Sequence, residues 1–329
     1  MIISKTPHRI SFFGGGTDYP DYYLKYGGKA LGTTIDKYCY LSVRKLPPYF
    51  DFKHRIVYSC IENVSHLDEI SHPAVREILK YLKIDYGLSI HHDGDIPARS
   101  GMGSSSSFTV GLLNTIYALE GRKISKEEIT EKTIYIEQEL IKENVGSQDQ
   151  VFAAHGGFNL IEFSTSGDIS VEPVIIKPDR LKILEKSLML VFTGISRMAT
   201  VAAGDKIKNI PNNIDYLFKI KNLVDDAYKV ITSPGKNLCE FGELLNETWK
   251  LKKRLSNEVS TPKIDELYDT VIKNGGIGGK LCGAGGGGFM LFFVEPENQA
   301  KVKESLNNNL CISFNFDFSG SKIIVYNPS

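Results

Sequence analysis

The sequence predicts an α+β protein with two lobes. Its first third is rich in strand-like segments, its second half is rich in helical segments, and its 329 residues exceed the length of a typical single-core domain. The change from a strand-first to a helix-first order falls between about Ser166 and Asp179. We therefore expect one domain over residues 1–172 and a second over residues 173–329.

In the N-terminal lobe, β-branched and aromatic residues predict strands at residues 2–4, 29–34, 38–43, 55–59 and 87–91. A helix is expected to begin near Ser105. A second helix should cover about 126–143, because Ser125 and Glu128 have the spacing of a capping box. A strand at 156–163 follows.

In the C-terminal lobe, a strand is expected at 187–192, followed by helices near 213–230, 238–255 and 264–274. Leucines and Trp249 recur at helical spacing, which predicts that they pack in the core. Lysines dominate the polar faces of these expected helices. The chain ends in a strand–helix–strand pattern at 288–294, 298–307 and 312–326.

The composition narrows the class of protein. Equal numbers of basic and acidic residues, 39 of each, give no electrostatic basis for nucleic-acid binding at the level of the whole chain, which leaves a local basic patch as the alternative. No apolar run approaches the length of a membrane span, and the N-terminus lacks the apolar core of a signal peptide. The five cysteines include no Cys-x-x-Cys pair and read as reduced thiols. We expect a cytoplasmic protein without nucleic-acid or membrane partners. The sequence leaves both a monomer and a homodimer as alternatives.

The most informative motif is the loop at residues 97–107, PARSGMGSSSS, which leads into an apolar helix. Glycines allow backbone to approach phosphate oxygens, and the free N–H groups and dipole of a helix start attract negative charge. The common P-loop is excluded, because no lysine follows Gly103. A flexible linker is disfavoured between two apolar segments. The motif predicts a nucleotide site.

Two further glycine clusters accompany this loop. Gly14–Gly16 lie between Arg9 and Asp18, so donors and acceptors suited to a polyhydroxyl ligand crowd a single loop; a tight turn without a ligand is the alternative. The second cluster, residues 278–288, is mostly glycine, which is conformationally expensive unless the backbone bends sharply or meets a ligand. We interpret it as a second phosphate-approaching loop.

Acidic residues supply candidate catalytic or metal-binding groups. Asp149 is expected in a loop beyond the second helix, as a base or metal ligand. Glu137 and Glu139 are two apart on that helix, so at most one points at a site, and by periodicity alone either fits a solvated face. The segment 91–95 holds two histidines and two aspartates, but alternating strand directions disfavour a metal cluster there.

Together, the three glycine loops and the interposed Gly-Ser-Gln-Asp-Gln at 146–150 resemble, in order and spacing, the motifs of the GHMP small-molecule kinases. The resemblance covers almost the whole chain. It implies an N-terminal lobe of the ribosomal-protein-S5 type, a ferredoxin-like C-terminal lobe, and ATP and a sugar bound between them.

The resemblance also implies roles for individual residues. Asp149 and Arg9 would be catalytic, and Ser105 and Glu137 would hold Mg²⁺. The implied ATP-binding residues are Pro97, Arg99, Ser100, Gly101, Met102, Gly103, Ser104, Ser105, Ser106 and Ser107. The implied substrate-binding residues are Gly15, Gly16, Thr17, Asp18, Tyr19, Arg197, Lys280, Gly283, Ala284, Gly285 and Gly286.

Within the family, the spellings GGGTDY, SGMGSSSS and GSQDQ look most like the heptose 7-phosphate kinase branch, which includes fucokinase-like enzymes. That branch implies ATP- and Mg²⁺-dependent phosphorylation of the anomeric hydroxyl of D-glycero-D-manno-heptose 7-phosphate, giving the 1,7-bisphosphate for activated heptose and surface polysaccharide. Arg197, Arg99 and Lys280 are candidates for the substrate's phosphate, Arg197 first because its guanidinium is a planar fork.

Other functions stay open. Galactokinases place Glu-His where this chain has Gly15-Gly16, which opens space and makes galactose a weaker candidate. A fucokinase- or galactokinase-like sugar-1-kinase, a catalytically silent sugar and nucleotide sensor, and a decarboxylase on the same scaffold are the alternatives.

Overall fold

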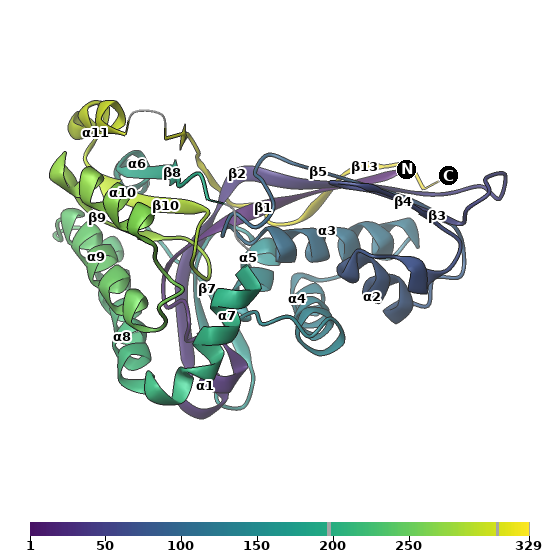
Figure 1. The fold of residues 1–329 in the computed structure, drawn as a ribbon, viewed down its shortest axis with the longest axis horizontal. Coiled ribbons are helices and arrows are strands. Elements are labelled where there is room, and N and C mark those ends of the chain that lie inside the picture. Colours follow the sequence, from purple (N-terminus) through teal and green to yellow (C-terminus); the bar gives the residue numbers. More distant parts are fainter. Residues whose placement is uncertain (196–198, 307–308, 329) are drawn as a thin grey trace.

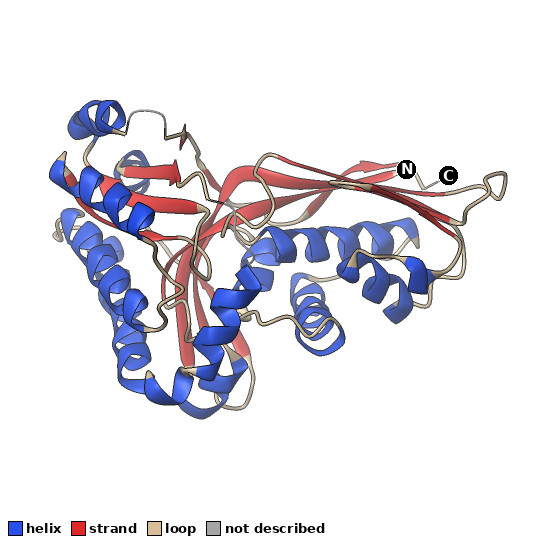
Figure 2. Ribbon diagram, viewed as in Figure 1, coloured by secondary structure: helices blue, strands red, loops and turns tan. Residues whose placement is uncertain are grey.

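The structure of the chain is a computed structural model that describes residues 1–195, 199–306 and 309–328 (Figure 1). Within these residues, the strands form a nine-stranded sheet and a four-stranded sheet (Figure 2). Helices α2, α3 and α4 lie along the long arm of the larger sheet (Figure 1). No helix in the described ranges combines the length and apolar character that crossing a bilayer needs.

The larger sheet runs in the order β13-β1-β2-β5-β3-β4, with β6 and β12 also paired to β2, and β7 to β6. Its strands are β1 (Ile2–Phe13), β2 (Gly28–Lys45), β3 (His54–Val57), β4 (Ile61–Val64), β5 (Leu88–Gly94), β6 (Phe158–Phe163), β7 (Ile169–Pro173), β12 (Phe316–Asp317) and β13 (Lys322–Tyr326). The N-terminal helices are α1 (Pro20–Tyr26), η1 (Leu67–Glu69), α2 (Pro73–Tyr81), α3 (Ser104–Leu119), α4 (Lys126–Tyr135), the π-helical turn η2 (Ile136–Leu140) and α5 (Gln148–His155).

The smaller sheet is antiparallel, in the order β11-β8-β10-β9. Its strands are β8 (Leu188–Phe192), β9 (Gly276–Leu281), β10 (Phe289–Val294) and β11 (Cys311–Ile312). The C-terminal helices are α6 (Pro178–Lys186), α7 (Ala199–Lys208), η3 (Ile210–Asn212), α8 (Ile214–Thr232), α9 (Cys239–Arg254), α10 (Pro262–Lys273), η4 (Pro296–Asn298) and α11 (Gln299–Ser305).

Most expected elements are present, with informative differences. Ser125 caps α4 by accepting the N–H of Glu128, as its spacing predicts. The two strands expected at 29–34 and 38–43 are one continuous strand, β2. The expectation of a loop around Asp149 is wrong, because α5 begins at Gln148. The last strands, β12 and β13, return to the larger sheet rather than staying with the C-terminal elements.

The two halves of the chain share a hydrophobic core. Phe12 and Phe13 of β1 pack edge-on against Phe241 of α9, with ring centroids 5.4 and 5.0 Å apart. All three side chains are fully buried. Since aromatic side chains bury large apolar areas, this contact holds the end of β1 against the C-terminal helices, and the loop that follows β1 begins there.

His8 makes the stability of the fold depend on pH. Its side chain is buried, and neither ring nitrogen has a hydrogen-bond partner in the part of the chain that the structure describes. Burial, together with the charges of Arg9 and His92, lowers the pKa of His8 to about 4. The unfolded chain therefore binds more protons than the folded one between pH 4 and the ordinary histidine pKa of 6.5, so His8 lowers stability as the pH falls through that window.

We expect His8→Leu to lose less stability than the wild type between pH 7 and pH 5, by about 2 kcal/mol. Comparing the two proteins isolates His8 from the other titrating groups. Urea unfolding at both pH values measures the difference, and equal losses in the two proteins would contradict the assignment.

Candidate active site

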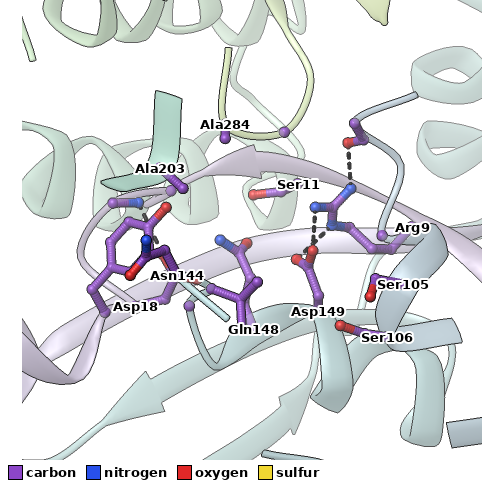
Figure 3. A pocket seen from close by; sticks show the side chains of 18 of the residues that line it. Arg9, Ser11, Asp18, Ser105, Ser106, Asn144, Gln148, Asp149, Ala203 and Ala284 are labelled. Carbon is purple, nitrogen blue, oxygen red and sulfur yellow. Dashed lines mark hydrogen bonds and ion pairs between the residues drawn. The ribbon is translucent and has the colours of Figure 1, made fainter. Parts of the chain in front are cut away.

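A cleft lies where β1, the start of α3, the start of α5 and the C-terminal elements meet (Figure 3). Its volume is about 280 Å³, near the lower end of the range of small-molecule sites, which is roughly 300 to 1,000 Å³. It is lined by Arg9, Ser11, Gly15, Gly16, Asp18, Tyr19, Arg99, Gly101, Gly103, Ser104, Ser105, Ser106, Glu143, Asn144, Val145, Gly146, Gln148, Asp149, Ala203, Thr248, Lys252, Lys280, Gly283 and Ala284.

An arginine–aspartate pair occupies the centre of the cleft. Arg9 donates from Nε and from a terminal nitrogen to the two carboxylate oxygens of Asp149, at 2.8 and 2.6 Å. Its other terminal nitrogen donates to the carbonyl of Gly101 at 2.6 Å. Arg9 is buried, whereas the Asp149 side chain is 26% exposed and so accessible to a ligand. The bidentate geometry fixes the orientation of the carboxylate.

A second carboxylate, Asp18, is buried beside this pair. It accepts hydrogen bonds from the backbone N–H of Gly16 at 2.9 Å and from the Gln148 side chain. Burial, reinforced by the charge of Asp149, raises the pKa of Asp18. A Cβ on Gly146 would lie 1.9 Å from an Asp18 carboxylate oxygen, so only glycine fits there.

The glycine-serine loop turns directly into α3. Gly103 precedes the helix in the left-handed conformation, with φ of 76°, and Ser104 is the first helical residue. Arg99, Gly101, Gly103, Ser104, Ser105 and Ser106 line the cleft. This end of the cleft therefore presents the N-terminus of a long helix, which favours bound anions.

A buried glutamate lies beneath the loop. Glu137, on the π-helical turn, accepts hydrogen bonds from Ser106 Oγ at 2.9 Å and Gln150 Nε2 at 2.6 Å, and the Thr109 hydroxyl also favours its charged form. Among the described residues, no hydrogen-bond partner lies against its Oε1. Burial raises the pKa of Glu137 to about 7. The unpartnered oxygen and the adjacent serine suit one face of a Mg²⁺ ion, a metal that proteins hold through few side chains, with phosphates and water completing its shell.

Similarity to known proteins assigns this arrangement to a family. The model of the GHMP kinases N terminal domain matches residues 69–157, and that of the GHMP kinases C terminal matches residues 229–311. The chain is 30% identical to a D-glycero-alpha-D-manno-heptose 7-phosphate kinase of Campylobacter jejuni, over 97% of this chain and 96% of that one. The chain belongs to the GHMP kinase family.

Solved structures agree with this assignment. A D-glycero-D-manno-heptose 1-phosphate kinase from Bacteroides thetaiotaomicron matches with a TM-score of 0.81 and 26% identity, over 99% of this chain and all of that one. The Lactococcus lactis galactokinase complexed with galactose shares the fold, with a TM-score of 0.75 at 20% identity, over 98% of this chain and 94% of that one. The protein is a GHMP sugar kinase: it transfers a phosphoryl group to an alcohol, and the family's co-substrate is ATP.

The kinase brings together many, but not all, of the predicted site residues. Met102 and Ser107 are buried away from the cleft, and Ser107 donates to the Pro7 carbonyl. Thr17 bonds the carbonyls of Gly14 and Lys29 and so supports the loop. Outside the lining set are Pro97, Ser100, Gly285 and Gly286. Arg197 lies outside the described residues.

Two of the four consecutive serines contact different carboxylates, and the expected Mg²⁺ site at Ser105 and Glu137 stays a prediction. Ser106, not Ser105, donates to Glu137, whereas Ser105 Oγ lies 3.4 Å from Glu143. Glu137 is buried and Glu139 is exposed, so the solvated-face interpretation of Glu137 is wrong, while neither glutamate is among the residues that line the cleft. In the described chain, no group of three or more His, Cys, Asp or Glu residues could hold a metal, and this includes segment 91–95.

The glycine cluster at residues 278–288, the third glycine loop of the chain, packs on the glycine-serine loop and also lines the cleft. Gly283 has φ of 66°, and a Cβ there would lie 2.5 Å from the Cα of Gly101. Ser100 and Phe289 are joined by a backbone hydrogen bond, and a Cβ on Gly288 would lie 2.2 Å from the Ser100 carbonyl oxygen. In this structure, contact between two backbones explains why these positions are glycine.

Several cleft residues were not predicted as site residues. Glu143 and Asn144 precede the motif at 146–150, and Gln148 lies inside that motif but was given no role, while Thr248 and Lys252 come from α9, more than 90 residues away along the chain. The ammonium of Lys252 donates to the carbonyls of Leu281 and Gly283, both at 2.6 Å. Proximity to Asp149 could have indicated Gln148, but nothing in the periodicity of α9 separates a cleft-facing residue from a core residue.

We expect Gly283→Ala to weaken ATP binding roughly tenfold, or about 1.4 kcal/mol. The new methyl group would displace Gly101 in the glycine-serine loop at residues 97–107, which we call the phosphate loop from here on. Isothermal titration calorimetry with ATP measures the effect. Gly121→Ala is the matched control: Gly121 has φ of 69° but nothing within 4 Å of an added Cβ. Equal ATP affinity in both variants would contradict the supporting role of Gly283.

Proposed function

We propose that this sugar kinase phosphorylates the anomeric hydroxyl of D-glycero-D-manno-heptose 7-phosphate, using ATP and Mg²⁺ and giving the 1,7-bisphosphate for activated heptose synthesis. The observation that carries the reaction type is the Asp149 carboxylate, which Arg9 holds at the mouth of the phosphate loop. The substrate is supported by the heptose 7-phosphate kinase that shares 30% identity over nearly the whole chain.

Phosphoryl transfer requires mainly alignment and charge neutralisation. In the proposed reaction, the N–H groups at the start of α3 bind phosphate oxygens, and Asp149 orients the attacking hydroxyl and accepts its proton. Arg9 fixes both oxygens of that carboxylate and offsets the negative charge that grows between donor and acceptor. Because Arg9 also binds Gly101, the donor loop and the acceptor carboxylate are aligned before substrates arrive.

Mg²⁺, when bound, would neutralise charge on the β- and γ-phosphates. Glu137 is the carboxylate that fits this role, because its Oε1 is buried and unpartnered. Ser105 or Ser106 would add a hydroxyl ligand: Ser106 already touches Glu137, while Ser105 is the more exposed of the two.

The substrate's own phosphate would require a cation. Lys280 is buried and donates to the carbonyls of Ser11 and Phe12 at 2.7 and 2.8 Å, so most of its hydrogen-bonding capacity serves β1. Arg99 is exposed and lines the cleft. Arg197, the first choice from the sequence, stays a proposal, and an unchanged KM for the sugar phosphate in Arg197→Ala would remove it.

The test is ADP release with heptose 7-phosphate, fucose, galactose and mevalonate, with the product position determined by phosphorus NMR. We expect turnover of heptose 7-phosphate and a new phosphate at the anomeric carbon. Turnover of unphosphorylated sugars alone would overturn the heptose assignment, and ATP binding without turnover of any compound would favour a sensor.

We expect Asp149→Asn to lower kcat by a factor of about 10² to 10⁴ with ATP affinity nearly unchanged, since the amide cannot accept the proton. Steady-state kinetics and ATP calorimetry measure the two effects. Asp179→Asn is the control, because Asp179 also lies in the first turn of a helix and is exposed away from the cleft. A kcat within threefold of the wild type would exclude Asp149 as the base.

We expect Glu137→Gln to weaken divalent-cation binding by about tenfold or more. Paramagnetic resonance of Mn²⁺ in the presence of ADP measures this without turnover. Glu139→Gln, two residues along and exposed, should leave the affinity unchanged. If both variants bound Mn²⁺ like the wild type, Glu137 would not be a ligand.

A further inference from the structure

Three buried polar atoms in the cleft lack a hydrogen-bond partner in the described protein: Ser11 Oγ, Gln148 Oε1 and Thr248 Oγ1. Their residues are only 7%, 6% and 3% exposed. An unsatisfied buried polar group is unfavourable because it has lost its hydrogen bonds to water, so native proteins contain few of them. Three that line one cleft indicate a ligand that supplies the missing partners.

Two of these atoms lie beside the catalytic pair, on the side away from the phosphate loop. Ser11 is two residues beyond Arg9 on β1, so both side chains share a face of the strand. Gln148 immediately precedes Asp149. Figure 3 shows Ser105 and Ser106 on one side of Asp149, and Gln148 on the other, toward Asp18.

Gly15 leaves open space next to these two residues. A Cβ on Gly15 would lie 3.7 Å from Gln148 Nε2 and 3.9 Å from Ser11 Oγ, which is ordinary contact. Its φ is not in the left-handed region. An alanine is therefore compatible with the free protein, and its methyl group would take up volume beside the two polar groups.

Thr248 brings the third atom from the other half of the chain. It lies one turn before Lys252 on α9, and Lys252 ties that helix to the carbonyls of Leu281 and Gly283. The position of Thr248 relative to the third glycine loop is therefore fixed. A ligand that contacts Thr248 together with Ser11 or Gln148 would bridge the two halves.

The chemistry of the three atoms selects hydroxyl groups over a phosphate. The amide nitrogen of Gln148 donates to Asp18, and the amide oxygen Oε1 can only accept a hydrogen bond. Asp18 is also an acceptor when ionised. A phosphate dianion would face two acceptors here, whereas a sugar hydroxyl can donate to them and accept from Ser11 or Thr248.

We propose that Ser11, Gln148 and Thr248 bind ring hydroxyls of the sugar and that Gly15 sets the width of this hydroxyl site. The proposal rests on the proposed sugar-kinase function and names residues that choose the sugar. Since none of the three atoms has a hydrogen-bond partner among the residues that the structure describes, we expect them to act in recognition and not to stabilise the free protein.

The test measures KM for the sugar, KM for ATP and the melting temperature of Thr248→Val and Ser11→Ala. We expect a 10- to 100-fold increase in KM for the sugar, a KM for ATP within twofold, and a melting temperature equal to or above that of the wild type, because each change removes an unsatisfied hydroxyl. Thr130→Val on α4 is the control: its hydroxyl bonds a helix carbonyl and lies outside the cleft.

Gly15→Ala tests the width of the site. We expect it to increase KM for the sugar at least tenfold, whereas Gly235→Ala, with open space around its Cβ and an ordinary φ, should have no effect. An unchanged KM for the sugar in Thr248→Val and Ser11→Ala, or a lowered melting temperature without a change in KM, would overturn the hydroxyl site.

The measurements use whichever sugar the wild type turns over, so the two proposals can fail separately. Turnover of fucose or galactose in place of heptose 7-phosphate removes the heptose assignment, and the same variants then decide the hydroxyl site on that sugar. Absence of binding of all the tested sugars to the wild type, measured by calorimetry, would overturn both.

Discussion

The Arg9 guanidinium is the constraint on which the rest of the site depends. It binds both oxygens of Asp149 and the carbonyl of Gly101, while the Arg9 backbone N–H donates to the carbonyl of Met102. A buried guanidinium is unfavourable unless it is fully paired, so these contacts form as a set. They join β1, the glycine-serine loop and α5, and they hold the Asp149 carboxylate against that loop.

The phosphate loop also packs against the C-terminal half of the chain. Gly283 and Gly288 allow the third glycine loop to pack on Gly101 and Ser100, closer than any side chain would permit. The aromatic contact of Phe12 and Phe13 with Phe241 fixes the same two halves together. The cleft walls therefore come from one continuous packed structure, and a preorganised wall stabilises developing charge without reorganising.

Residues at a helix start predicted the cap or turn at that same place. Features that depend on contacts between distant parts of the chain could not be predicted in this way. The cap of α4 and the glycine turn into α3 follow from the residues at each helix start. Which serine meets Glu137 depends on the rotational phase of α3, which a run of four serines does not reveal. The start of α5 has no side-chain cap to mark it. The pairing of β13 with β1 joins segments more than 300 residues apart. Patterns read over a few neighbouring residues carry no information about such a pairing.

The two proposals together assign the choice of reaction and the choice of sugar to different residues of the cleft. Asp149 faces the phosphate loop and carries the arginine, whereas Asp18 is held by neutral donors, Gly16 and Gln148. In the proposed reaction, the hydroxyl that reacts is the one next to Asp149. In the proposed arrangement, the orientation of the sugar, and hence which hydroxyl comes there, depends on groups at the other side of Asp149: Ser11, Gln148 and Thr248. Of these, Ser11 and Thr248 lie outside the motif spellings that set the sugar-kinase branch, so related kinases can share every motif and still select different sugars.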